Sequence, residues 1–408
     1  METVVIPEDK CFYIWAPRAL VGTELSVREN ILVEVSSGIV AGIYSMSPAE
    51  VKGFDASRGK LFVLEGDITL LPCLLDAHVH LALLNDNGEE HSCRDGSLTE
   101  KQNISTPPEL EAFQSYGIGG IRDGGDLRSW NWQVKQVVLN QSKNGRSLSI
   151  VSTGQALRRK GHYGSFLGCG YSSLQELDAL LDRLLSMGID QVKAILSGLV
   201  SFKNYGKVGS LAMSAEELRR VVSRSREQGV KVMAHANSIS AVELALGTGV
   251  DSLEHGYFIN REQLEVMAAR QLAWVPTLIP LATQIRKPLS SQWKQEEIEL
   301  IDRTCCEHMD KLCPALKYGV PLGIGTDSGA SGVNPGDSLL SEMLLYSEAG
   351  LTNKQVLQAA TATNAKIMGL EKTKGALQVG REPALLAVRG DPLADLNALK
   401  EIEYYFHS

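Results

Sequence analysis

Six residues of the sequence have the side chains needed to bind divalent cations. They are four histidines, a lysine and an aspartate that stand within or at the end of short apolar runs: His78, His80, Lys193, His235, His255 and Asp327. Imidazole nitrogens and carboxylate oxygens are ordinary ligands of zinc and its neighbours, at about 2.0 to 2.2 Å. A bound cation lowers the pKa of its water towards about 7, which makes hydroxide available at neutral pH. These residue types therefore predict a metal centre with hydrolytic chemistry.

Each of these residues also has a simpler interpretation when it is taken alone. An H-x-H pair occurs on protein surfaces and in hydrogen-bonded cores as well as at metals. Lys193 could extend its stem along the rim of a fold, His235 and His255 could each be a buried, hydrogen-bonded histidine, and Asp327 could cap a turn in GTDSG. What favours a shared site is their common position at the ends of predicted strands.

Those strands belong to a repeated pattern. Eight short apolar runs rich in β-forming residues alternate with amphipathic stretches, which is typical of βα units around a parallel sheet. The runs are LLPCLLDAHVH, GIGGIRDGG, LSIVSTG, IDQVKAILSG, VKVMAHA, VDSLEHG, LAWVPTL and VPLGIGTDSG. Between them lie helix start signals, such as the capping box of Ser214 with Glu217, and Thr352 before NKQVLQAATATNAKIMGL. The count of eight predicts an α/β fold, a (β/α)8 TIM barrel.

Both ends of the chain differ from its middle. Residues 1–65 contain alternating segments such as ILVEVSSGIVAGI and no long helical pattern. The tail from residue 375, GALQVGREPALLAVRGDPL, again consists of strand and turn signals. We therefore expect a small flanking β domain built from residues 1–65 plus 375–408, and a barrel over residues 66–374 that carries the metal centre.

The barrel explains why the six residues would meet. Reactive groups of such a barrel lie at the carboxyl ends of its strands, where the following loops form one mouth. Five of the six end a predicted strand, and Lys193 lies within the fourth run. Because side chains at positions i and i+2 of a strand share a face, His78 and His80 can reach one ion from the same side.

Composition restricts the class of partner. Of the 408 residues, 44% are hydrophobic and 22% are charged, which is ordinary for a globular protein and argues against a disordered or fibrous chain. The net charge of −8 is spread along the sequence without basic blocks. This pattern predicts no nucleic-acid partner and no membrane-surface binding, and leaves a small-molecule substrate as the expected partner.

The remaining features concern location and redox state. The N-terminus METVVIPEDKCFYIW lacks the basic start of a signal peptide, and no run of about 18 apolar residues occurs, so we expect a cytoplasmic protein. Seven scattered cysteines without a C-x-x-C pair are interpreted mostly as buried apolar residues. Three other histidines, His91, His308 and His407, are expected to be solvated.

At this point the sequence resembles a known family. LLPCLLDAHVHL, the lysine of QVKAILSG, MAHA, SLEHG and GIGTDSG are similar in order and spacing to the amidohydrolase superfamily, particularly its prolidase-like, Xaa-Pro dipeptidase and arginine carboxypeptidase-like group. The resemblance covers essentially the whole chain, including the GDPL turn near its end. Cys73 and Ala384 depart from the usual pattern, with cysteine in place of a glycine and alanine in place of an acidic residue, but neither is a ligand position.

The resemblance implies a role for each ligand. His78 and His80 would bind the more buried metal, and His235 and His255 the more exposed one. Asp327 would bind the buried metal and face the bridging water. Lys193 would bridge both metals as a carbamate formed with carbon dioxide. A buried lysine suits that reaction, because burial lowers its pKa and leaves a neutral, nucleophilic amine.

Four further residues are candidates for substrate contact. The segment GQALRRKGHYGSFLG after the third run contains His162 and Tyr163, and similar family members have a glycine-flanked histidine there. Arg158 or Arg159 could receive a substrate carboxylate through paired hydrogen bonds, although arginines are common on surfaces. Asn237, two residues after His235, could face inward. The alternatives are a loop-shaping role for His162 and a turn role for Asn237.

The predicted reaction is hydrolysis of an amide or peptide-like C–N bond, in a dipeptide or an N-acyl amino acid. A metal-bound hydroxide would attack the carbonyl carbon, and Asp327 would take its proton and return it to the leaving nitrogen. Hydrolysis of a cyclic amide, a lactone or an ester is the main alternative. A deaminase is less favoured, since HANSIS lacks the expected glutamate, and a non-catalytic binding protein on the same fold is another alternative.

Some properties stay open at the level of sequence. The ligand set suits two zinc ions but equally manganese, iron or cobalt. Family resemblance implies association into a homo-oligomer. Substrate identity depends on the loops after the strands, which one sequence does not decode.

Overall fold

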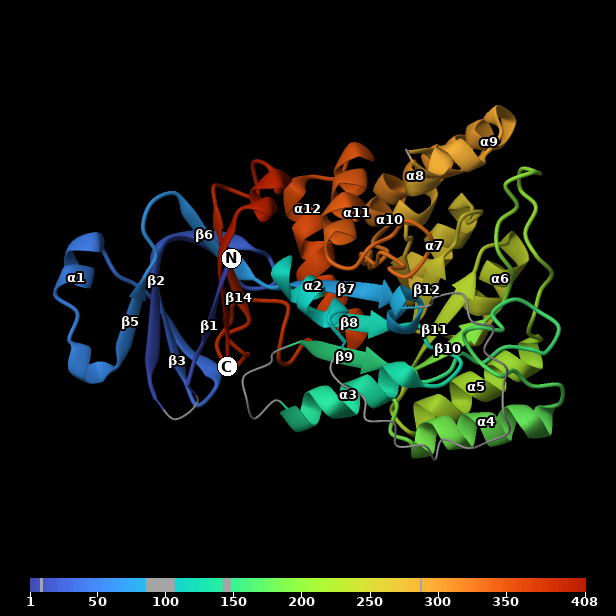
Figure 1. Cartoon of the computed structure of the whole chain (residues 1–408), viewed down its shortest axis with the longest axis horizontal. Coiled ribbons are helices and arrows are strands. Elements are labelled where there is room, and N and C mark those ends of the chain that lie inside the picture. The colour runs from blue at the N-terminus through green and yellow to red at the C-terminus, as the bar shows by residue number, and fades with distance from the viewer. Residues whose placement is uncertain (8–9, 86–106, 142–147, 287) are drawn as a thin grey trace.

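The computed structural model consists of a β-sheet region at one end of its long axis and an α/β region at the other, as Figure 1 shows. It describes residues 1–7, 10–85, 107–141, 148–286 and 288–408. The chain is therefore an α/β protein, as the sequence predicts. Of the residues considered above, His91 and Cys93 lie outside the described ranges.

One mixed sheet contains strands from both ends of the chain, and we call it the end sheet. Its eight strands are β1 (Glu2–Val5), β2 (Phe12–Val21), β3 (Ser26–Ser36), β4 (Ile39–Ser45), β5 (Lys60–Val63), β6 (Ile68–Pro72), β14 (Leu385–Arg389) and β15 (Ile402–His407). Their order is β1-β15-β14-β6-β2-β3-β4, and β5 pairs with β2. β1 runs parallel to β15, with Glu2 opposite Tyr404.

The end sheet forms because its strands alternate apolar and polar residues. In β3, Ile31, Val33 and Val35 are fully buried, whereas Glu34 and Ser36 on the other face are partly exposed and Leu32 on that face is buried beside Tyr13 and Trp15. Ile31, Val33 and Val35 pack with buried residues of the other strands, such as Ile14 and Phe406. Alternation of this kind places one face of a strand in the core, so the end sheet has an apolar interior.

The α/β region contains two parallel sheets. The first is β7 (Leu74–Val79), β8 (Ile118–Asp123) and β9 (Ser149–Ser152), and the second is β10 (Gln191–Ile195), β11 (Lys231–Ala236), β12 (Ser252–His255) and β13 (Ala273–Val275). Isolated parallel bridges connect the two sheets. On one side, Leu157, which follows β9, pairs with Ala194 of β10. On the other side, the segment with Leu322 and Ser328 pairs with Trp274 of β13 and Val79 of β7. In Figure 1 the arrows of β7, β8 and β9 point away from the end sheet. The carboxyl ends of these strands, and the loops that follow, therefore lie on the far side of the molecule.

The eighth predicted strand, VPLGIGTDSG, differs from the expectation. It contains single bridge residues rather than a regular strand, Leu322 with Trp274 and Ser328 with Val79. Its backbone still bonds both neighbours: Gly323 N donates to Trp274 O at 2.8 Å, and Ala77 N donates to Ile324 O at 3.0 Å. Glycines weaken a strand and permit bends, which explains the irregular segment.

Helix α1 lies beside the end sheet, and the other helices lie between and around the strands of the α/β region (Figure 1). The helices are α1 (Pro48–Lys52), α2 (Glu109–Ser115), α3 (Trp130–Gln141), α4 (Leu174–Ser186), α5 (Ala215–Glu227), α6 (Ile239–Thr248), α7 (Arg261–Arg270), α8 (Ile279–Ile285), α9 (Gln295–Met309), α10 (Leu312–Tyr318), α11 (Asp337–Glu348), α12 (Asn353–Gln358) and α13 (Asn364–Met368). The predicted capping box of Ser214 with Glu217 begins α5, and the predicted helix start at Thr352 begins α12, where Thr352 forms a further capping box with Gln355. Among the helices of the described ranges, none is long and apolar enough to cross a membrane.

Two expectations about individual side chains are wrong. His308 and His407 are buried rather than solvated, because His308 packs between the rings of Tyr257 and Trp274, and His407 ends a strand of the end sheet. Of the cysteines in the described ranges, Cys73 and Cys305 are buried as expected, but Cys306 and Cys313 are exposed and Cys11 and Cys169 are intermediate. All six are free thiols.

Candidate metal centre

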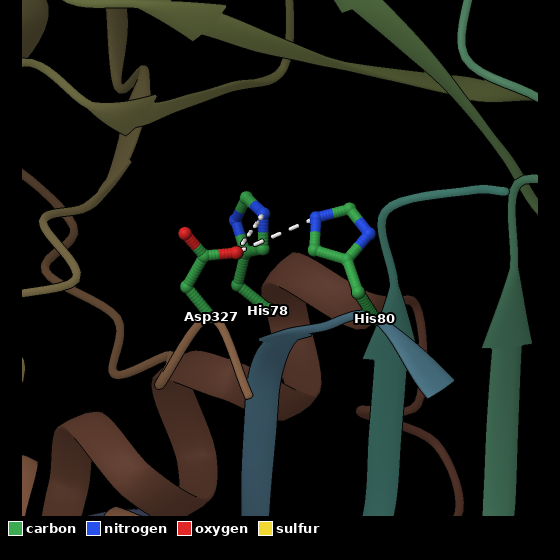
Figure 2. Close-up of side chains that lie close together, drawn as sticks. All are labelled: His78, His80 and Asp327. Carbon is green, nitrogen blue, oxygen red and sulfur yellow. Dashed lines mark ion pairs between the residues drawn. The ribbon is translucent and has the colours of Figure 1, made fainter. Parts of the chain in front are cut away.

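Three of the predicted ligands form a compact group, which Figure 2 shows at the end of β7. One ligand atom each from His78, His80 and Asp327 lies within 4.8 Å of the others. Asp327 Oδ1 is 3.6 Å from His78 Nε2 and 3.4 Å from His80 Nε2. The other two histidines adjoin this group: the ring of His255 has its centroid 5.0 Å from that of His78 and 4.6 Å from that of His235. All four histidines are thus neighbours in one buried cluster.

The rings of His78 and His80 are oriented by acceptors behind them. His78 Nδ1 donates to Glu254 Oε2 at 2.7 Å, and His80 Nδ1 donates to the carbonyl of Gly125 at 3.1 Å. Each proton therefore lies on Nδ1, and each Nε2 turns its lone pair towards Asp327. Burial lowers the pKa of both rings, that of His80 to about 3, so both are neutral at pH 7.

His255 is oriented through a hydroxyl. Thr277 Oγ1 lies 2.6 Å from His255 Nδ1 and donates its own proton to Pro276 O at 2.7 Å. The hydroxyl must accept from His255, so the proton of His255 is on Nδ1 and its Nε2 carries the lone pair. Both His255 and Thr277 have positive φ, 63° and 53°. Strained backbone of this kind persists only where the surroundings hold it, and it gathers at functional sites.

The ring of His235 is contacted by two protein groups at the same nitrogen, Nε2. Its Nε2 faces the carbonyl of Gly198 at 3.4 Å and the side-chain nitrogen of Asn237 at 3.1 Å, and Asn237 also donates to Gly198 O at 3.2 Å. The carbonyl oxygen of Gly198 accepts and the amide nitrogen of Asn237 donates, so the two contacts call for opposite tautomers of His235. Burial lowers the pKa of His235 to about 3. Asn237 Oδ1 is buried and has no hydrogen-bond partner within the described residues.

Lys193 lies inside this cluster. Its Nζ is 3.2 Å from His78 Nε2, and only 1% of the residue is exposed. Burial lowers the pKa of Lys193 to about 8, although the carboxylates of Glu254 and Asp327 oppose the change. The amine is therefore easier to deprotonate than an ordinary lysine, which suits either a nucleophile or a ligand precursor.

Asp327 is held by its backbone rather than by its carboxylate. Its φ is 57°, and its N donates to His78 O at 2.7 Å. The neighbouring Thr326 is fixed by Asp76, which accepts from its N at 3.0 Å and from its hydroxyl at 2.7 Å. Burial raises the pKa of Asp327 to about 6, while Lys193 opposes that change. The side chain, 20% exposed, can exchange protons near neutral pH.

Two important residues were not predicted from the sequence. Glu254 and Arg122 are fully buried, and Arg122 Nη2 donates to both carboxylate oxygens of Glu254 at 2.9 Å. Arg122 also donates to Ala77 O, while Glu254 accepts from His78. The pair links β8 and β12 to the strand that carries the H-x-H pair. A signal existed, since both are charged residues inside apolar runs, IRDGG and SLEHG.

The candidate substrate residues are placed differently from one another. The ring of Tyr163 lies 5.3 Å from that of His235, beside the cluster. His162 is half-buried and its Nδ1 is 3.3 Å from Ser210 Oγ. Arg159 pairs with Glu217 at 2.6 Å, and Arg158 donates to the carbonyl of Gly168 at 2.6 Å. Both guanidinium groups are therefore bonded within the protein, whereas Tyr163 borders the histidines.

This arrangement fits a divalent cation. A metal ligand must present a lone pair from a neutral imidazole or a carboxylate, with its other polar atoms bonded to the protein. His78, His80 and His255 meet both conditions through Nε2, and the ring of His235 adjoins them, with its centroid 4.6 Å from that of His255. The donor set of nitrogen and oxygen suits zinc, manganese, iron or cobalt.

Comparison with known proteins gives a consistent result. The model of the amidohydrolase family matches residues 132–404 of the chain. Ochratoxinase of Aspergillus niger is 24% identical, over 98% of this chain and 85% of that protein. Imidazolonepropionase of Shewanella sp. (strain ANA-3) is 26% identical, over 86% of this chain and 85% of that protein.

The fold is shared with solved structures. The crystal structure of a Xaa-Pro dipeptidase with bound methionine in its active site superposes with a TM-score of 0.76 at 20% identity, covering 98% of each chain. Crystalline ochratoxinase of A. niger gives a TM-score of 0.79 at 20% identity, covering 98% of this chain and 95% of that chain. At this level of identity the similarity concerns the fold, and both ends of the chain are included in it.

Proposed function

We propose that this chain, which belongs to the amidohydrolase family, is a metal-dependent hydrolase that cleaves an amide or peptide-like C–N bond. The observation that carries the proposal is the buried cluster of four neutral histidines around Lys193 and Asp327. Hydrolase names among the relatives, such as ochratoxinase, support the same class of reaction. Dipeptides and N-acyl amino acids are the substrates we propose.

The proposed architecture is a (β/α)8 barrel over residues 66–374 with a flanking β domain of residues 1–65 and 375–408. Seven parallel strands and the bridge-forming segment with Leu322 and Ser328 support eight βα units. The end sheet supports a flanking domain from both chain ends, and β6 (Ile68–Pro72) extends it past residue 65. In this architecture the loops after the strands form the mouth of the active site.

For the ligands we propose the roles that the family resemblance implies, and the grouping of His78, His80 and Asp327 supports the first set. We assign His78, His80 and Asp327 to one cation, and His235 and His255 to a second. Lys193, adjacent to His78, would connect the two after carboxylation by carbon dioxide. The metals are proposed to be two zinc ions, with manganese, iron or cobalt as substitutes. When bound, such cations acidify water and polarise a substrate carbonyl.

The protein groups then have separate tasks. Asp327, with a pKa raised to about 6 by burial, can accept a proton on its carboxylate and give it to the leaving nitrogen. Glu254 and Arg122 hold His78 in one orientation. Tyr163 and Asn237 face the same centre and are proposed to contact substrate, as is His162 at the edge of this region. Arg159, despite its pairing with Glu217, stays a candidate for a substrate carboxylate.

A substrate panel tests this proposal. Metal-reconstituted protein is assayed with N-acyl amino acids, dipeptides, a lactam and a lactone, and its metal content is measured in the same preparation. We expect hydrolysis of the linear amides and close to two divalent ions per chain. Hydrolysis of only the lactam or the lactone would favour the alternative of a cyclic amide, lactone or ester hydrolase. Active protein without bound metal would refute the metal-dependent mechanism.

A further inference from the structure

Large apolar side chains are exposed beside the candidate centre. We define the apolar rim as Tyr163, Phe166, Leu199 and Leu211. Phe166 is 39% exposed, Leu199 56% and Leu211 44%, and Tyr163 is half-buried. Isolated exposed apolar residues are normal on proteins, but grouped ones mark binding surfaces. The grouping of these four therefore needs an explanation.

Two loops carry the rim, and both lie over His235. The first follows β9 and contains Tyr163, whose ring is 5.3 Å from that of His235 and 5.6 Å from that of Phe166, in an edge-on arrangement. The second follows β10. It begins at the carbonyl of Gly198, 3.4 Å from His235 Nε2. Leu199 is the next residue along the chain.

The two loops are also bonded to each other. His162 Nδ1 and Ser210 Oγ are 3.3 Å apart, and these residues directly precede Tyr163 and Leu211. Within the second loop, Gly209 N donates to the carbonyl of Leu199 at 3.2 Å, which brings both ends of that loop together. These bonds hold the two loops that carry the rim against each other and beside the candidate centre.

The side chains of the rim are uncharged, although the second loop also carries the exposed Lys203 and Lys207. Arg158 donates to backbone carbonyls of its own loop, and the guanidinium of Arg159 is paired with Glu217. The guanidinium of Arg158 is therefore engaged within its loop, and that of Arg159 would have to leave Glu217 to bind a substrate carboxylate. Tyr163 and Phe166 present aromatic rings, which favour offset or edge-on contact with another ring.

We infer that the apolar rim is a subsite for a large uncharged side chain of the substrate, preferably an aromatic one. The inference rests on the proposed function, because it treats the metal centre as the place where the amide bond is cleaved. It adds a substrate class: amides that carry an aryl group on the acyl or the amine side. Burial of that group against Leu199 and Phe166 would increase its affinity.

Three amides and two substitutions test the subsite. N-acetylglycine, N-phenylacetylglycine and N-acetylphenylalanine are compared in wild-type protein, Leu199→Asn and Phe166→Ser. We expect at least one aryl substrate to exceed N-acetylglycine about 10-fold in kcat/KM, and each substitution to remove about 10-fold of that advantage through KM. Leu139→Asn is the matched control, since Leu139 is equally exposed, at 55%, on α3. It should retain the wild-type preference.

Each other outcome has a definite meaning. Equal cleavage of all three amides, or equal losses on all three in the variants, would overturn the subsite and leave the proposed function standing. Equilibrium binding of N-acetylphenylalaninamide to metal-loaded protein gives a second readout. If no amide is cleaved but this binding weakens in Leu199→Asn, the proposed reaction fails and the subsite stands. If sedimentation shows that the variants lose self-association with unchanged preference, the rim is a contact between copies of this chain, and the inference is overturned.

Discussion

The interior of the end sheet and the candidate centre are both buried, but the first consists of apolar residues and the second of polar ones. The interior of the end sheet consists of apolar side chains such as Ile14, Val33 and Phe406. The centre contains neutral histidines, a lysine and carboxyl groups at almost the same degree of burial. Apolar residues stabilise a fold simply by leaving water, whereas buried polar groups cost free energy unless each has a partner. Burial of apolar residues in the end sheet can therefore offset the free-energy cost of the buried polar groups in the centre.

Partners in the centre come mainly from other strands. His78 depends on Glu254, which depends in turn on Arg122, and His255 depends on Thr277. Removing one member of such a chain leaves another buried and unsatisfied. The comparison predicts that substitutions in the sheet lower stability with chemistry intact, and that substitutions in the centre lower activity more than stability.

The largest effect is expected for Lys193→Ala. This change should remove the second cation and lower kcat/KM by about 10³-fold or more, because one metal contributes several kcal/mol to the transition state. Metal analysis and steady-state kinetics measure both. Short carboxylic acids should partly restore activity by taking the place of a carbamate, and added bicarbonate should assist reconstitution of the wild type only. Unchanged metal content and activity would show that Lys193 is structural.

The end sheet gives the converse case in Phe406→Ala. Phe406 is fully buried against Phe62, with ring centroids 5.2 Å apart. We expect a loss of about 3 to 5 kcal/mol in the free energy of unfolding, typical of a buried Phe→Ala change, and a normal kcat in the protein that stays folded. Denaturant unfolding and kinetics at low temperature measure the two. Val27→Ala, at a position 52% exposed on β3, is the control and should change stability by less than about 0.5 kcal/mol. A large fall in kcat would mean that the two regions are coupled.

Asp327→Asn is expected to separate binding from proton transfer. An amide oxygen can still meet a cation but cannot carry the proton, so kcat should fall about 10²-fold or more with little loss of metal. In the wild type, kcat/KM should decline as pH falls through the pKa of Asp327, which burial raises to about 6. Because Asp327 and a coordinated water titrate together, the observed value belongs to the pair. A variant with normal kcat and the same acid limb would assign the proton to another group, and His162 would be the next residue to substitute.

The last prediction concerns the pH dependence of stability, an effect that is small near neutral pH and grows as the pH falls. Burial lowers the pKa of His308 to about 3, well below the usual value near 6.5. The unfolded chain then binds one proton more than the native one between these values, so stability contributed by neutral His308 is present above pH 6.5 and is lost as pH falls. The slope is at most about 1.4 kcal/mol per pH unit. In metal-free protein, the free energy of unfolding is measured against pH for the wild type and His308→Asn. The slope below pH 6.5 should be smaller in the variant by up to that amount. Equal slopes in the two proteins would show that His308 is not neutral in the fold.

The parts of the fold that sequence predicted share one property, which is local patterning. Seven parallel strands and the capping box at Ser214 follow from residues close together in the chain. The convergence of the ligands was also foreseeable, because parallel strands of one layer end on the same side. GIGTDSG was predicted as a strand, but its glycines and the positive φ of Asp327 give an irregular segment instead.

What sequence did not predict depends on contacts between distant segments. Glu254 and Arg122 are distinguished from surface charges only by meeting each other and His78 inside the fold. His308 is on a helix whose pattern gives no sign that Pro276 O, 3.1 Å away, will accept its proton. The pairing of Arg159 with Glu217 likewise has no local signal in the sequence. In each case the decisive partner is far away in sequence.

The parallel pairing of β1 with β15 has a consequence for biosynthesis. Residues 2–5 are made before the whole α/β region, yet their ladder partners, residues 404–407, are made after it. β6 likewise waits for β14, since Leu70 pairs with Ala387. A nascent chain folds from its N-terminus as it emerges, so the α/β region can become compact while β1 and one edge of β6 still lack partners. Unpaired strand edges promote aggregation. The chain is therefore exposed to aggregation until residues 385–407 have been synthesised and have paired with β1 and β6.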